Sequence, residues 1–82
     1  MNEIEKIILD EKFHAVSFLY KGKFYGFAGW WILYWGEVWK EENTKDYDSK
    51  EEFLKDKPFD GRSLAEAYAV GDITDVDPEY EP

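Results

Sequence analysis

Hydrophobic positions in the amino-terminal half follow two different periods. Isoleucines at 4, 7 and 8 fall on one face at helical spacing. Asn2 and Glu5 form an N-x-x-E pattern at the start of this stretch, which is typical of a helix N-cap. This predicts a short helix over residues 3–10, although the β-branched content also suits a strand. From Phe13 to Tyr20, aromatic and β-branched residues favour a strand instead.

A second strand is predicted to follow the first through a tight turn. The Lys-Gly-Lys sequence at 21–23 interrupts the apolar pattern, and Gly22 supplies the positive φ that hairpin turns need. The pattern resumes at Phe24. Glycine within the second strand, at Gly26, predicts a bulge or a close approach of another group to the backbone.

The stretch from Trp30 to Lys40 is apolar on both faces if it forms a strand. One face would carry Trp31, Leu33, Trp35, Glu37 and Trp39, and the other Trp30, Ile32, Tyr34, Gly36 and Val38. A helix would instead stack the tryptophans in a stripe. We favour the strand because the preceding hairpin needs a third strand for stability. Such a strand would be central, with helices covering one side.

Two more helices are predicted in the carboxyl-terminal half. A Ser-x-x-Glu sequence at 49–52 precedes a helix over about residues 50–56, and a second one at 63–66 precedes a helix over 64–69. The polar residues 41–48 are expected to form a loop.

These elements predict an α+β fold in one small domain spanning residues 1–82. Its centre is a three-stranded antiparallel β-meander over roughly residues 13–39, packed by two or three short helices. We expect residues 1–71 to form the folded core. Residues 72–82 are expected to begin as a short edge strand and to continue as a partly flexible acidic segment.

Charge is distributed unevenly along this chain. The 82 residues include 19 acids and 10 bases, and residues 41–82 carry the whole net charge of −9. An acidic balance disfavours direct contact with nucleic acid and favours a basic partner, because phosphate contacts need clusters of lysine and arginine. An acidic surface also keeps an aromatic-rich protein in solution, and this simpler explanation stays open.

Composition excludes several kinds of chemistry. The chain has no cysteine, which removes disulfides and thiolate sites, and His14 is its only histidine, which removes a histidine pair for zinc. The acids between Asp72 and Glu79 do not follow the register of a calcium-binding loop. We therefore expect no metal and no cofactor.

The sequence also bears on location. Its beginning lacks the basic and apolar regions of a secretory signal, so we expect a cytoplasmic protein. The longest stretch without charge lies between Phe24 and Gly36, short of the roughly 20 residues that span a bilayer. No membrane span is expected.

Glu37 is the best candidate for a catalytic group, because a carboxyl between Trp35 and Trp39 would lose hydration and gain a raised pKa. The alternative is a strand end where Glu37 meets solvent or a lysine. One histidine and isolated carboxyls do not make a converging catalytic set, so we expect no enzyme activity.

Eleven of the sixteen aromatic residues fall before residue 41, which is many for a three-stranded sheet with short helices to cover, so we expect some exposed rings beside the acids. That composition is typical of a protein–protein interface. Our leading prediction is a small acidic module that binds a basic protein, as an inhibitor, immunity factor or nucleic-acid mimic does. The expected partner-binding residues are Trp31, Trp35, Glu37, Trp39, Glu41, Glu42, Asp46, Asp48, Asp72, Asp75 and Asp77.

Two alternatives remain. The first is a small-molecule or glycan-binding module that uses Trp30, Trp31, Trp35 or Trp39. The second is a homo-oligomeric structural module whose exposed aromatic face pairs with itself.

Overall fold

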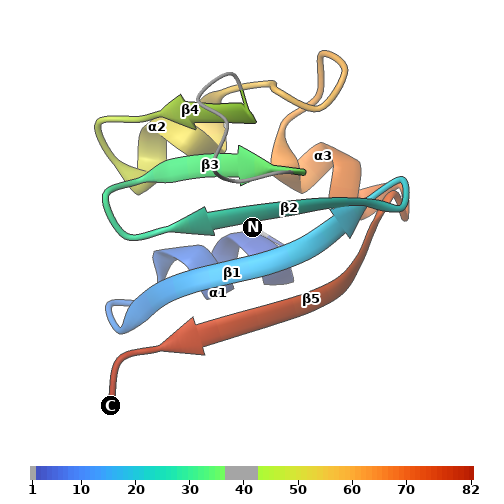
Figure 1. The fold of residues 1–82 in the computed structure, drawn as a ribbon. Coiled ribbons are helices and arrows are strands. Elements are labelled where there is room, and N and C mark those ends of the chain that lie inside the picture. Colours follow the sequence, from blue (N-terminus) through green and yellow to red (C-terminus); the bar gives the residue numbers. More distant parts are fainter. Residues whose placement is uncertain (1, 37–42) are drawn as a thin grey trace.

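A five-stranded antiparallel sheet carries three short helices on one of its sides, as Figure 1 shows with the helices behind the sheet. In the computed structural model, residues 2–36 and 43–82 are described. The elements in chain order are α1 (Glu3–Leu9), β1 (Phe13–Tyr20), β2 (Lys23–Ala28), β3 (Ile32–Trp35), β4 (Thr44–Asp46), α2 (Lys50–Lys55), α3 (Leu64–Ala69) and β5 (Ile73–Tyr80).

All three helices begin at the caps that the sequence predicts. The Asn2 side chain accepts a hydrogen bond from the Glu5 N–H, and the Glu5 carboxylate accepts one from the Asn2 N–H. Ser63 and Glu66 repeat this reciprocal box at α3, whereas at α2 only the Ser49 half is formed. These bonds satisfy backbone donors that a helix end otherwise leaves unpaired.

The sheet is built outward from the predicted hairpin. β1 and β2 are joined by Lys21 and Gly22, whose φ values of 50° and 79° are both positive, as in a type I′ turn. β3 pairs with β2, β4 pairs with β3, and β5 pairs with the other edge of β1, which gives the order β4-β3-β2-β1-β5.

The three-stranded meander was therefore wrong in its number of strands. β4 lies within residues 41–48, where polarity predicts a loop, and β5 runs for eight residues where a short strand and a tail are expected. Both are edge strands that pair with a single neighbour and expose most of their side chains, so neither shows a strong hydrophobic pattern. β3 starts only at Ile32, and the predicted end of that strand at 37–39 falls outside the described residues.

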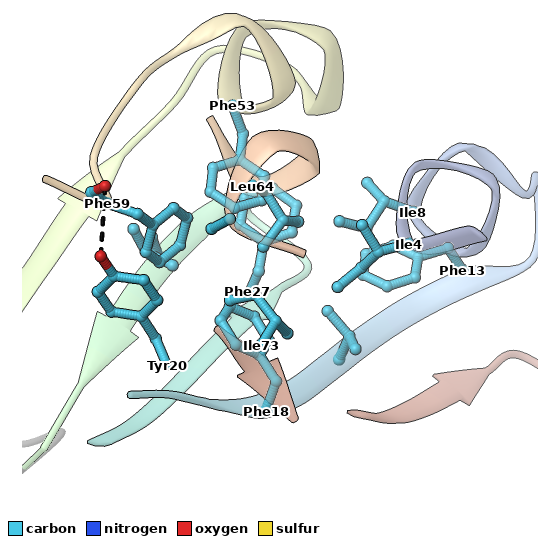
Figure 2. Close-up of a cluster of buried hydrophobic side chains, with 13 residues drawn as sticks. Ile4, Ile8, Phe13, Phe18, Tyr20, Phe27, Phe53, Phe59, Leu64 and Ile73 are labelled. Atoms are coloured by element: carbon cyan, nitrogen blue, oxygen red, sulfur yellow. Dashed lines mark hydrogen bonds between the residues drawn. The ribbon is translucent and has the colours of Figure 1, made fainter. Parts of the chain in front are cut away.

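The core lies between the sheet and the helices. Figure 2 shows Ile4 and Ile8 of α1, Phe53 of α2 and Leu64 of α3 pointing toward the rings of the sheet. Phe27 of β2 stacks against Phe53 with ring centroids 4.1 Å apart. The remaining buried side chains are Phe13, Val16, Phe18, Tyr20, Leu33, Phe59, Ala67 and Ile73.

Register irregularities decide which way β1 side chains point near its start. Strict alternation puts His14 on the same face as Val16, yet Val16 is buried and His14 is exposed. The pairing of β1 with β5 shifts between Phe13 and Ala15, and an extra residue at such a point reverses the alternation.

Candidate functional site

The sheet face opposite the helices is the most distinctive surface of the described chain, and we call it the open face. Paired residues on neighbouring strands point to the same side, so the register defines its members. They are Ala15, Ser17 and Leu19 of β1, Phe24, Gly26 and Ala28 of β2, Ile32 and Tyr34 of β3, Thr44 and Asp46 of β4, and Thr74, Asp77 and Glu79 of β5.

Four large apolar side chains on the open face lie outside the core. Leu19, Phe24, Ile32 and Tyr34 belong neither to the buried cluster nor to the side chains packed against it. Phe24 is 42% exposed, and its ring centroid lies 6.2 Å from that of Tyr34. No described helix covers these residues, so the open face presents apolar surface to its surroundings.

Gly26 leaves room for the Tyr34 ring against the backbone of β2. A Cβ atom at Gly26 would overlap the outer end of that ring, so this glycine is the place of close approach that the sequence predicts. Burial, followed by the negative charge of Glu79, raises the pKa of the Tyr34 phenol. The tyrosine is therefore a neutral group that extends across the sheet from β3 toward β5.

The turn between β2 and β3 places one tryptophan outward and one inward. Trp30 and Trp31 have φ values of 78° and 55°, a left-handed conformation that costs a non-glycine residue roughly 1–2 kcal/mol. Trp31 stacks on Phe27 at 5.9 Å, and the Lys50 ammonium lies 5.5 Å from the Trp31 ring. Trp30 is 89% exposed.

A shallow hollow of about 420 Å³ lies beside Trp30. It continues from the turn onto the open face and is lined by Ala28, Gly29, Trp30, Ile32, Tyr34 and Thr44. A second hollow at the other end of the open face lies between Leu19, Phe24 and the acids Asp75 and Asp77. Apolar surface thus continues along the face from one end to the other.

Acids flank this apolar surface on both edges of the sheet. Asp75, Asp77 and Glu79 lie along β5, and we call these three the β5 rim. Asp75 occupies a bulge in this strand, with a φ of 53°. Asp46 of β4 stands on the opposite edge.

No lysine or arginine occupies an open-face position among the described strand residues. Lys23 and Lys45, the strand lysines, lie on the helix side of the sheet, because each pairs in register with a core residue. Their neighbours agree with that side: Lys23 lies over the Tyr25 ring, and Lys45 bonds Asp56 at 2.7 Å. The charged strand residues that border the open face are therefore all acidic in the part of the chain that the structure describes.

The predicted partner-binding residues do not form one cluster. Asp46, Asp75 and Asp77 border the open face, Asp46 on the β4 edge and the other two on the β5 edge. Trp31 and Trp35 are half-buried against the core on the helix side. The remaining members are Asp72, which is bonded to Arg62, Asp48, which is exposed before α2, and Glu37, Trp39, Glu41 and Glu42, which lie outside the described residues.

The open face also contains residues that the prediction omitted. Leu19, Phe24, Tyr34 and Glu79 were absent from the expected partner-binding set, although each lies beside members of it. The alternation of β1, β2 and β3 separates Leu19, Phe24 and Tyr34 from the core positions. The sequence pattern does not indicate which side of the sheet the helices cover.

Polar groups on the helix side satisfy one another and serve the fold. The Tyr20 hydroxyl donates to Asp60 at 2.6 Å and accepts from Arg62, which also donates to Asp72 at 2.6 Å. These bonds join the end of β1 to the turn at residues 59–62 and to the start of β5. Through its bond to Arg62, Asp72 contributes to holding these segments together.

A second polar cluster lies between β4 and α2. Asp56 accepts from the Lys45 ammonium at 2.7 Å and from the Tyr47 hydroxyl at 2.6 Å. The two hydrogen bonds, that of Lys45 first, lower the pKa of Asp56 from 3.8 to about 2. Burial and the bond to Asp56 raise the pKa of Tyr47.

The described residues also bear on metal binding, on the candidate catalytic group and on membrane-spanning length. Within residues 2–36 and 43–82, no three histidine or acidic side chains gather closely enough to hold a metal ion. Glu37, the candidate general acid, falls outside these ranges. No described helix has the length and apolar character needed to cross a bilayer.

Comparison with known proteins found no match to this chain. It matches no protein-family model, no curated protein and no solved structure. The geometry of the open face is accordingly the basis for inferring function.

Proposed function

We propose that this chain is a binding protein whose open face docks a basic protein partner, as an inhibitor, an immunity factor or a nucleic-acid mimic does. One observation carries the proposal: apolar surface lies between acids on both sheet edges, and no described strand residue on that face is a lysine or arginine. Charge of one sign speeds the encounter with a basic partner, and apolar side chains slow its dissociation.

The exposed Trp30 ring is the expected anchor of the complex. Tryptophan is among the residues that dominate binding energy when a partner buries them, and this one is 89% exposed at the edge of the apolar surface. Its backbone has a positive φ of 78° and its ring is not part of the core, whereas the ring of the neighbouring Trp31 packs inward on Phe27. Strain of this kind occurs where a turn is held in place for recognition.

Capture of partners from the source lysate tests the proposal with matched variants. The wild type is compared with a rim variant, Asp75→Asn with Asp77→Asn and Glu79→Gln, and with a control that neutralises three exposed acids elsewhere, Glu3, Glu11 and Glu51. We expect the wild type and the control to capture a basic protein in stoichiometric amount at low salt, and the rim variant to lose it. High salt should release the partner.

Two results would refute this function. One is the absence of any basic partner at low salt. The other is equal capture by the wild type and by the rim variant, which would place the binding surface elsewhere on the molecule.

A second candidate is a module that binds a small molecule or a glycan. The hollow beside Trp30 favours it, because an exposed indole next to Ile32 and Tyr34 can stack on a sugar ring. A ligand screen that follows tryptophan fluorescence, repeated with Trp30→Ala, distinguishes it from protein binding. A ligand that shifts the wild-type emission but not that of the variant would support this candidate.

A further inference from the structure

The width of the open face suggests the shape of the basic partner. One row of paired residues crosses all five strands, from Asp46 on β4 through Ile32, Ala28 and Ala15 to Glu79 on β5. Neighbouring strands are about 4.8 Å apart, so four spacings separate the two acidic edges by roughly 19 Å.

The side chains in the middle of this row are short, so they rise little above the sheet. Ala15 and Ala28 have only methyl side chains, and in the next row Ser17 lies beside Gly26, which the Tyr34 ring covers. Larger side chains surround this part of the sheet, with Ile32 and Tyr34 on β3 and Leu19 and Phe24 toward one end. The open face therefore offers an apolar strip between acidic edges, with its lowest part at Ala15 of β1 and Ala28 of β2.

We propose that the occupant of the open face is an amphipathic α-helix of the partner, with an apolar stripe bordered by lysine or arginine on both sides. This inference rests on the proposed function and specifies it further. A helix with its side chains is about 10–12 Å across, and long basic side chains extend from its flanks to both edges of a ~19 Å face. The apolar stripe would then cover Leu19, Ile32 and Tyr34.

An extended segment suits the face less well. A single strand is about 5 Å wide, so it cannot reach Asp46 and the β5 rim together. Addition of a strand to the outer edge of β5 is also disfavoured, because Pro78 has no N–H to donate and the bulge at Asp75 interrupts the regular ladder.

A second copy of this chain is disfavoured by charge. A symmetric pairing of two open faces places the same surfaces against each other, which brings acidic edges together in a chain of net charge −9. A helix on the open face would instead complete a sheet covered on both sides, a common arrangement of layers.

Three synthetic peptides test the inference on the intact protein. The first is helical, with leucines at i, i+3, i+4 and i+7 and lysines on both flanks. The second has the same composition in scrambled order, and the third keeps lysines on one flank only. Affinity is measured by calorimetry at low and high salt, and the surface contacted is mapped from amide NMR shifts.

We expect the two-flank helix to bind at least about tenfold more tightly than the scrambled peptide and to shift amides of β1, β2 and β3. Asp46→Asn should weaken the two-flank helix by about threefold and leave the one-flank helix unchanged, since only the former reaches that edge. The rim variant should weaken both.

The outcomes separate this inference from the proposed function. Equal binding of helical and scrambled peptides, lost in the rim variant, would overturn the helical occupant while supporting a basic partner. Shifts confined to α1, α2 and α3 would overturn the use of the open face by the helix. Failure of all three peptides to bind at low salt would also overturn the helical occupant, and capture from lysate would then decide the proposed function separately.

Discussion

The Tyr34 ring lies on the backbone of Gly26, and this contact shapes the centre of the open face. A larger residue at 26 would lift the ring from the sheet and raise the floor of the apolar strip. At the scale of single residues, a missing side chain on one strand thus determines where a ring on the next strand rests.

We expect Gly26→Ala to destabilise the protein by about 1 kcal/mol, because overlap with the tyrosine outweighs the better strand propensity of alanine. In a Tyr34→Ala background the same change should be neutral or stabilising. Urea unfolding of the four proteins in this cycle measures the coupling. Equal effects in both backgrounds would contradict the contact.

Asp56 is the residue whose ionisation is most clearly tied to the fold. Its pKa is about 2 in the folded chain against an ordinary value of 3.8. Because the folded value is the lower one, the carboxylate stabilises the fold above the unfolded pKa, and this contribution disappears as pH falls from 3.8 toward 2.

We expect Asp56→Asn to cost about 1 kcal/mol near neutral pH, after allowance for solvent screening of a partly exposed pair. The difference in unfolding free energy between wild type and variant should shrink as pH is lowered through this window. A difference that stays constant from pH 6 to pH 2 would show that the carboxylate charge has no part in it.

At the scale of elements, the β2–β3 turn combines strain with exposure. Its two tryptophans both have positive φ, a conformation that glycine adopts without the cost that a Cβ atom imposes. The turn after β1 is different, since there Gly22 takes one of the two left-handed positions.

Two substitutions of Trp30 distinguish the effect of backbone strain on stability from the effect of the indole ring on binding. Trp30→Gly should be more stable than Trp30→Ala by about 1 kcal/mol, because both remove the indole and only glycine removes the strain. Both variants should weaken partner binding at least about tenfold relative to wild type. Thermal unfolding and binding of the captured partner measure the two effects independently.

At the scale of the whole molecule, acids on the sheet edges oppose self-association. The open face presents apolar side chains, and β4 and β5 each pair with a single strand among the described residues. Charge and Pro78 on β5 are typical devices that prevent edge-to-edge pairing.

Neutralising the β5 rim is therefore expected to raise the apparent molar mass of the protein at high concentration. Light scattering after size exclusion should show the rim variant shifting toward a dimer or larger species, while the control variant at Glu3, Glu11 and Glu51 behaves like the wild type. A wild type that is already dimeric would favour the homo-oligomeric alternative.

Local features of the sequence determined most of the elements. The caps at Asn2, Ser49 and Ser63 and the turn at Gly22 depend on residues within a few positions of one another, so the sequence predicts them correctly. The alternation of β3 is also local, and it correctly separates Leu33 and Trp35 from the opposite face.

Only the tertiary structure decided which face the helices cover and which strands form the edges. β3 is apolar on both faces, so its pattern distinguishes two sides without telling the inner from the outer. The sequence therefore predicted Trp31 and Trp35 as partner contacts, whereas the fold packs them against the core and leaves Tyr34 and Trp30 on the outside. β4 and β5 are edge strands held by backbone pairing with one neighbour, and β5 pairs with a strand far from it in the sequence, which leaves little trace in the hydrophobic pattern of their own residues.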